Sequence, residues 1–420
     1  MAIIRPFKAV RPVPELADKV AALPYDVMNT EEAKEMVVDN PYSFLHVDKA
    51  EIDLDPSVNI YDKVVYEKAR ENLYSMFEKG IFIRDEKPYL YIYRQIMNGR
   101  AQTGIVACTS IDDYRNNVIK KHEHTRPDKE QDRINHVDYC NANTGPIFLT
   151  YRSRDEINKI IDKYTEKEPM YNFASEDKVI QQVWKIDKEE DIQALVYHFE
   201  GVKSLYIADG HHRAASAVRV GMMRREQNPN YTGEEEFNYF LSVIFPDKDL
   251  RIMDYNRVVK DLNGLSKDEY LQKISENFIV SEYEGEGQYK PEQKHSFGMY
   301  LEGKWYKLVA KEGTFNAEDP VARLDVSILQ NNLLRPILGI EDPRTSDRID
   351  FVGGIRGLKE LERRANKDMK IGFSMYPTTI GDLMAIADAG EVMPPKSTWF
   401  EPKLRSGLFI HELAPGACGL

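Results

Sequence analysis

The stretch LYIADGHHRAASAVRVGMM, Leu205–Met223, decides the organisation of this chain. Its first residues, Leu205–Ala208, are apolar and have polar neighbours, which predicts a short buried strand. Asp209-Gly210 predicts a sharp turn, because glycine tolerates backbone conformations that a side chain would block. From His211 onward, alanines and valines fall on adjacent helical turns, which predicts an α-helix.

This junction of strand, turn and helix favours anion binding. The first N–H groups of a helix have no partner within the helix, and the helix dipole is positive at that end. Three side chains that can donate hydrogen bonds follow at once: His211, His212 and Arg213. We therefore predict a phosphate-binding site at Gly210, His211, His212 and Arg213. The alternative is an ordinary helix start whose polar side chains face water.

The composition bounds the class of protein. A chain of 420 residues exceeds what one core usually organises, so two or three domains are expected. A net charge of −12 argues against nonspecific binding to nucleic acid or to anionic membranes. Cys108, Cys140 and Cys418 are too widely separated for a disulfide framework or a zinc box, which fits a reducing cytoplasm. We expect no signal peptide and no membrane span, and the sequence leaves the oligomeric state open.

The pattern of elements predicts an α+β fold with a mixed sheet and helices. We expect an N-terminal α+β region over residues 1–112, a core over 113–230 that contains the phosphate site, and a C-terminal α+β region over 231–420. A charged, helix-rich segment at about 152–200 predicts an insertion into the core. A wide apolar face over 319–338 predicts one long helix.

A second polar segment is VIKKHEHTRPDKEQDRINHVDYC, Val118–Cys140. It predicts the end of a strand and then a helix from Pro127 to about Cys140, because proline suits the first helical turn. His122 and His124 would share one face of that strand and could bind a metal, but no third ligand stands at a diagnostic spacing.

Glu123, between these two histidines, is the candidate general base. The alternative for this carboxylate is an ion pair with Arg126 or Arg133. If the two polar segments meet, the site has the parts that phosphoryl transfer needs. Arg213 and the histidines would neutralise phosphate charge, and Asp209 offers oxygen to a magnesium ion. No P-loop is present, and the glycines of Gly353–Gly357 lack the dinucleotide-binding spacing.

These motifs resemble known families. Glu123 in His-Glu-His-Thr-Arg-Pro, then Gly145-Pro146-Ile147, then Asp209-Gly210-His211-His212-Arg213 resemble the ordered boxes of the ParB/sulfiredoxin superfamily, a nucleotide-binding fold. Within it they resemble the free-serine kinases, which phosphorylate L-serine with a nucleotide donor. The resemblance implies that Glu123 is the base and that the Gly-His-His-Arg box holds phosphates.

A second resemblance covers nearly the whole chain and names no activity. Pro24-Tyr25-Asp26-Val27, Asn40-Pro41-Tyr42-Ser43, the Gly210 box and Met393-Pro394-Pro395-Lys396-Ser397-Thr398 resemble a prokaryotic family of unknown function. The two Pro-Tyr segments either line a cleft or form packed loops.

We therefore expect a magnesium-dependent kinase of a small hydroxylated metabolite, most simply free L-serine, with ATP or ADP as donor. His122, His124 and Arg126 are candidate substrate contacts. One alternative is a nucleotide-binding regulatory protein without turnover. The other is a hydrolase with a metal held by His122, His124, His211 and His212. No nucleic-acid partner is expected, since the acidic run Glu234–Glu236 follows the core where DNA-binding relatives carry basic segments.

Overall fold

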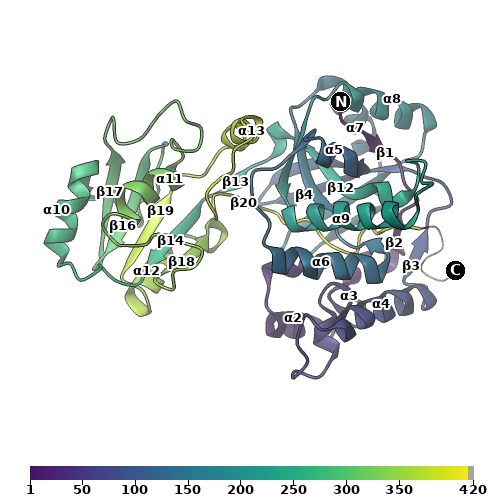
Figure 1. Cartoon of the computed structure of the whole chain (residues 1–420), viewed down its shortest axis with the longest axis horizontal. Coiled ribbons are helices and arrows are strands. Elements are labelled where there is room, and N and C mark those ends of the chain that lie inside the picture. The colour runs from purple at the N-terminus through teal and green to yellow at the C-terminus, as the bar shows by residue number, and fades with distance from the viewer. Residues whose placement is uncertain (415–420) are drawn as a thin grey trace. The chain divides into compact units, whose positions relative to one another are not determined.

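The computed structural model describes residues 1–414 and divides the chain into two compact units. The first unit comprises Met1–Leu250 together with the chain from Pro402 onward, and the second comprises Arg251–Glu401. Residues 1–112 and 113–230, expected as separate regions, therefore lie in one unit. The C-terminal segment returns to that unit and is drawn in yellow among its purple and teal elements (Figure 1). Cys418 lies outside the described residues.

The first unit is built on a mixed nine-stranded sheet in the order β6-β11-β8-β12-β5-β4-β10-β9, with β1 paired to β5. The pairs β6–β11 and β8–β12 are parallel and the others are antiparallel, which confirms the α+β class with a mixed sheet. The strands of this unit are β1 (Ile4–Arg5), β2 (Val10–Pro12), β3 (Phe82–Arg84), β4 (Leu90–Met97), β5 (Arg100–Ser110), β6 (Ile119–Lys120), β7 (Ala142–Asn143), β8 (Ile147–Tyr151), β9 (Tyr171–Ala174), β10 (Ile180–Ile186), β11 (Leu205–Asp209), β12 (Tyr239–Pro246) and β21 (His411–Glu412).

Helices surround this sheet, and α6 packs against both α9 and α4 (Figure 1). The helices are α1 (Ala17–Val20), α2 (Thr30–Val37), α3 (Leu45–Asp48), α4 (Lys63–Glu78), α5 (Ile111–Arg115), α6 (Pro127–Cys140), α7 (Asp155–Thr165), α8 (Glu189–Glu200) and α9 (His211–Gln227). The helix predicted to begin at Pro127 is confirmed as α6. Among the described residues, no helix combines the length and the apolar character needed to cross a bilayer.

Two connections explain how the sheet is assembled. Asn98-Gly99 joins β4 to β5, and both residues have positive φ (52° and 77°), as a tight hairpin turn requires. The segment at about 152–200, expected as an insertion, supplies α7, β9, β10 and α8. Because β10 pairs with β4 along Ile180–Ile186, this segment extends the main sheet.

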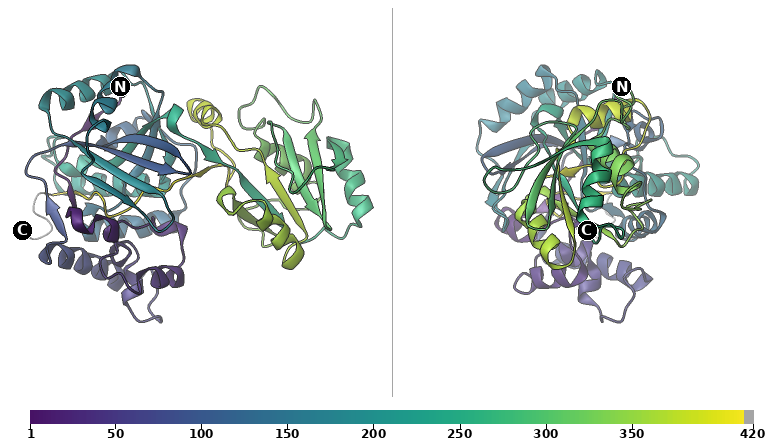
Figure 2. Two further views of the ribbon diagram at one scale, coloured as in Figure 1. Left: turned by 180° about the vertical axis from the view of Figure 1, so that it is seen from behind. Right: turned by 90° about the vertical axis from the view of Figure 1, so that its left-hand side faces the viewer.

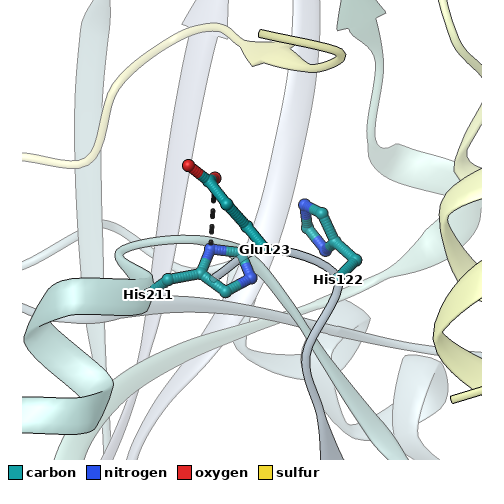
Figure 3. Close-up of side chains that lie close together, drawn as sticks. All are labelled: His122, Glu123 and His211. Atoms are coloured by element: carbon teal, nitrogen blue, oxygen red, sulfur yellow. Dashed lines mark ion pairs between the residues drawn. The ribbon is translucent and has the colours of Figure 1, made fainter. Parts of the chain in front are cut away.

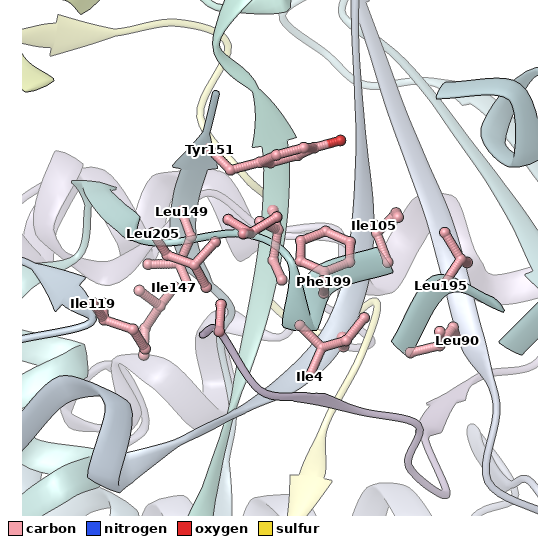
Figure 4. Close-up of a cluster of buried hydrophobic side chains, with 14 of the residues drawn as sticks. Ile4, Leu90, Ile105, Ile119, Ile147, Leu149, Tyr151, Leu195, Phe199 and Leu205 are labelled. Carbon is pink, nitrogen blue, oxygen red and sulfur yellow. The ribbon is translucent and has the colours of Figure 1, made fainter. Parts of the chain in front are cut away.

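Alternation along the strands divides the core between the two faces of the sheet. Ile105 of β5 and Leu90 of β4 pack with Leu195 and Phe199 of α8 in one buried cluster (Figure 4). The opposite face of β4 presents Tyr91 and Tyr93, whose rings contact Phe409 of the C-terminal segment. This contact places the C-terminal segment against the sheet that carries the site.

The second unit is drawn in green to yellow in Figure 2. It contains a six-stranded antiparallel sheet in the order β15-β17-β16-β19-β14-β18. The strands of this sheet are β14 (Tyr255–Val259), β15 (Phe278–Glu282), β16 (Ser296–Leu301), β17 (Lys304–Ala310), β18 (Ile349–Gly353) and β19 (Ile371–Met375). Two further strands, β13 (Ile252–Met253) and β20 (Trp399–Phe400), pair with each other. The helices of this unit are α10 (Lys267–Asn277), α11 (Asp325–Leu329), α12 (Lys359–Lys367) and α13 (Ile380–Asp388).

The single helix predicted over 319–338 is wrong. The Asp319 side chain accepts from the N–H groups of Val321 and Ala322, and this local turn competes with helix. The regular helix begins only at Asp325, and a π-helical turn, Gln330–Leu334, follows it.

Asp325 provides a stability prediction. One carboxylate oxygen accepts from His295 N–H at 2.9 Å, and the other has no partner within residues 1–414. Burial raises the pKa of Asp325 to about 7, against the opposing charge of Lys294. The unfolded chain ionises this group near its ordinary pKa of 3.8, whereas the folded chain keeps it protonated up to about pH 7. Its stabilising contribution is therefore lost as pH rises from about 4 to 7.

We expect Asp325→Asn to remove this loss, which has a limiting slope of about 1.4 kcal/mol per pH unit. Urea unfolding of the full chain at pH 5 and pH 7, followed by tryptophan fluorescence, measures it. If the unfolding free energy changed by the same amount between pH 5 and pH 7 in wild type and in Asp325→Asn, the raised pKa of Asp325 would be contradicted.

Candidate functional site

The site lies at the C-terminal ends of two parallel strands of the sheet, β6 and β11. Because β6 and β11 run in the same direction, the chain leaves both strands at this end. His122 and Glu123 follow β6, and His211 is the first residue of α9 after β11. The three side chains meet there (Figure 3). The Glu123 carboxylate lies 3.8 Å from Nδ1 of His211, and the rings of His122 and His211 pack edge to face with centroids 4.5 Å apart.

Gly210 makes the turn between β11 and α9. Its φ of 90° is in the left-handed region, and an added Cβ would lie 3.2 Å from the Arg213 guanidinium, so glycine is favoured on both counts. No side chain caps α9 in the part of the chain that the structure describes. The first N–H group of the helix that donates to the backbone of the turn is that of Ala214, which donates to the carbonyl of Gly210. The helix therefore begins without a side-chain cap, and the prediction that an anion binds there depends on this feature.

The three polar side chains after Gly210 each contact another segment. His211 faces Glu123, and Nε2 of His212 accepts a hydrogen bond from the backbone N–H of Arg126 at 3.0 Å. Arg213 donates to the carbonyl of Pro146 at 2.7 Å. These contacts tie the 121–126 loop and the start of β8 to α9, a task that the sequence does not reveal. Their role toward phosphate stays a prediction.

Asp209 is paired with two cations. Its carboxylate lies 3.5 Å from Nζ of Lys403 and 3.7 Å from the guanidinium of Arg213. Burial acts to raise the pKa of Asp209, but the charges of Lys403 and Arg213 outweigh it and hold that pKa below its ordinary value. Sequence reasoning missed Lys403. Lys403 lies in the stretch 393–408, whose sequence has no helical or strand periodicity. Nothing in that stretch indicates that Lys403 pairs with Asp209.

Burial lowers the pKa of three histidines of this site, His122, His211 and His212. Burial lowers the pKa of His122 to about 4, against the charge of Asp209 and the neighbouring backbone of Ile207. Burial also lowers the pKa of His211 well below 6.5, and the proximity of His122 adds to the effect. The pKa of His212 is lowered as well, mainly by burial. These rings therefore do not supply the positive charge that the sequence suggested.

The strand expected to include His122 and His124 ends earlier in the structure, at Lys120. Residues 121–126 form a loop after β6, so His122 and His124 do not share a strand face: His122 is buried and His124 is exposed. The Arg126 side chain pairs with Asp128 at 2.8 Å, and Arg133 pairs with Asp132 at 2.9 Å. The four histidines of the hydrolase alternative do not lie together in one cluster. The structure groups His122 and His211 with Glu123 instead.

A narrow cavity lies beside Arg213. It is lined by Tyr25, Asp48, Arg133 and Thr144 among others, and holds about 20 Å³, which is room for a single water molecule. The Arg133 guanidinium stacks 4.0 Å from the centroid of the Tyr25 ring. Tyr25, in the Pro-Tyr segment of the sequence, is therefore both packed and part of a cavity wall. The sequence could not show which residues this tyrosine meets.

A family model described as a protein of unknown function, DUF1015, matches residues 4–327. The chain belongs to the DUF1015 family. This confirms the resemblance to a family of unknown function. No curated protein sequence matches this DUF1015 chain.

Several solved structures are similar to it. A mutant free serine kinase in complex with AMP is 16% identical, with 73% of this chain and 91% of that chain covered and a TM-score of 0.37. SbnI with a C-terminal truncation, from Staphylococcus aureus, is 10% identical, with 73% and 87% covered and a TM-score of 0.39. A conserved hypothetical protein from Pyrococcus furiosus is 16% identical, with 73% and 94% covered and a TM-score of 0.34. Similarity at this level assigns no activity.

Proposed function

We propose that this protein is a nucleotide- and magnesium-dependent phosphotransferase that acts on a small hydroxylated metabolite, with free L-serine as the leading acceptor. One observation carries the proposal: Glu123, which the motif resemblance marks as a base, lies 3.8 Å from the first residue of the uncapped helix α9. A carboxylate beside an anion-binding helix end is the pairing that transfer of a phosphoryl group to a hydroxyl requires.

Phosphates of the nucleotide bind at the N-terminus of α9 in this proposal. The backbone N–H groups of His211, His212 and Arg213 begin the helix and have no side-chain cap among the described residues. Arg213 adds a positive charge. Burial acts to lower its pKa, but the surrounding carboxylates of Asp26 and Asp209 hold that pKa above its ordinary value. The nucleotide supplies the phosphoryl group.

Glu123 accepts the proton of the acceptor hydroxyl. Its side chain is half-exposed and so is accessible to a substrate, and the buried ring of His211 lies 3.8 Å from its carboxylate. The hydroxyl oxygen forms a bond to the terminal phosphorus, and its proton passes to Glu123. The bond from phosphorus to the bridging oxygen breaks, and its electron pair leaves with the shortened nucleotide. Of the candidate substrate contacts, exposed His124 and Arg126 are retained, while buried His122 supports His211.

The residues fit magnesium in part. Asp209 is a partly exposed carboxylate at the start of the turn, but Lys403 and Arg213 already balance its charge. We propose that magnesium is bound jointly with the nucleotide, with phosphate oxygens as most of its ligands and Asp209 as one. Magnesium would neutralise charge on the phosphates.

The direct test is a product assay with the full chain. ATP or ADP is incubated with L-serine, L-threonine, L-homoserine or glycerate, with magnesium or with excess chelator, and phosphorylated products are identified by mass spectrometry. We expect O-phosphoserine with at least one donor, and its loss in chelator. Absence of any phosphorylated acceptor with either donor would overturn the proposal and favour a nucleotide-binding regulatory protein.

A further inference from the structure

Two buried imidazoles at this site have unsatisfied nitrogens. His122 is 2% exposed and His211 is 5% exposed. Neither ring nitrogen of His122, nor Nε2 of His211, has a hydrogen-bond partner among residues 1–414. The remaining nitrogen, Nδ1 of His211, faces the Glu123 carboxylate at 3.8 Å, which is too long for a hydrogen bond. Buried polar atoms without partners are costly, so such a cluster calls for a ligand that satisfies them.

The same atoms have the arrangement of a metal site. One nitrogen from each histidine and one carboxylate oxygen of Glu123 all lie within 4.8 Å of one another (Figure 3). Ligands about 2.0–2.2 Å from a zinc ion are roughly 3–3.5 Å apart, so binding requires a contraction of about 1 Å. The loop that carries His122 and Glu123 can supply this movement, since Glu123 is on the surface.

The donor set indicates which cation the site suits. Two imidazoles and one carboxylate suit zinc and its neighbours, whereas magnesium prefers oxygen ligands alone.

We propose that His122, Glu123 and His211 form a binding site for a divalent transition-metal ion such as Zn²⁺, distinct from the magnesium that accompanies the nucleotide. An ion held there occupies the Glu123 carboxylate. In the catalytic scheme above, on which this consequence rests, Zn²⁺ therefore withdraws the base and inhibits transfer.

Metal binding is measured without nucleotide or acceptor. A chain that binds no metal would therefore overturn the metal site without bearing on the proposed phosphotransfer. The metal-free full chain is titrated with Co²⁺, followed by visible absorption, and then with Zn²⁺ in competition. We expect one ion per chain, with spectra that indicate nitrogen and oxygen ligands. His122→Gln, Glu123→Gln and His211→Gln should each weaken binding at least about tenfold, since changes even to residues that support ligands cost that much.

His124→Gln is the matched control, because it removes a histidine from the same loop outside the cluster. Buried His122 and His211 are riskier substitutions, so Glu123→Gln, at a surface position, keeps the test decisive if those variants fail to fold. Absence of Co²⁺ and Zn²⁺ binding to the wild-type chain, or equal binding by wild type and Glu123→Gln, would overturn the proposal.

Discussion

Replacing Glu123 with glutamine is expected to lower the turnover of phosphoserine formation about 10²- to 10⁴-fold while leaving nucleotide affinity nearly unchanged. Glutamine keeps the size of the side chain but cannot accept the hydroxyl proton. The carboxylate lies beside His211 on a loop, and its side chain is half-exposed. Because the proposed phosphate contacts are backbone N–H groups of α9, the change should appear in kcat and not in nucleotide binding.

The matched control is Glu200→Gln, the same substitution at an exposed glutamate that ends α8. It should leave turnover unchanged. Initial rates with L-serine and the productive donor, together with calorimetric nucleotide affinities for the three proteins, make the comparison. Equal turnover in wild type and Glu123→Gln would dismiss Glu123 as the base.

Replacing Arg213 with alanine is expected to weaken ATP and ADP binding about ten- to a hundredfold, since a charge-assisted hydrogen bond contributes about 1.5–3 kcal/mol. The Arg213 side chain is almost buried, and its Nε has no partner among the described residues. Its contacts to Asp209 and Pro146 hold the guanidinium at the end of the helix. Loss of this cation also leaves Asp209 with less compensation, so a lower melting temperature is expected.

Arg213→Lys separates charge from geometry. Lysine keeps the cation but cannot form the forked contacts, so an affinity between those of wild type and Arg213→Ala is expected. Calorimetry with ATP and with ADP, at a temperature where each variant is folded, measures both effects. If the melting temperature falls in Arg213→Ala while nucleotide affinity stays the same, Arg213 has only a structural role.

Local parts of this fold were predictable from the sequence because the residues that encode them are neighbours. The strand, the Gly210 turn and the helix that starts at His211 lie within one stretch, and each has its own signal. The Asn98-Gly99 hairpin and the helix from Pro127 are similar cases. The helix expected from residue 319 begins only at Asp325, because a local turn at Asp319 competes with it, and apolar periodicity does not register such a turn.

The contacts that complete the site join distant segments and carry no local signal. Lys403 reaches Asp209 because the C-terminal segment returns to the first unit, which no pattern around residue 403 indicates. The burial that keeps His211 neutral is likewise a property of the packed sheet edge. The sequence therefore identified the polar side chains, but their neutral state and their protein partners follow from tertiary packing.

The measurement that tests the central claim most directly is a crystal structure of the wild-type protein with a non-hydrolysable ATP analogue, magnesium and L-serine. We predict phosphate oxygens within hydrogen-bond distance of the first N–H groups of α9, and the serine hydroxyl between the terminal phosphate and the Glu123 carboxylate. Nucleotide phosphates bound elsewhere, with the start of α9 in contact only with water, would contradict the account.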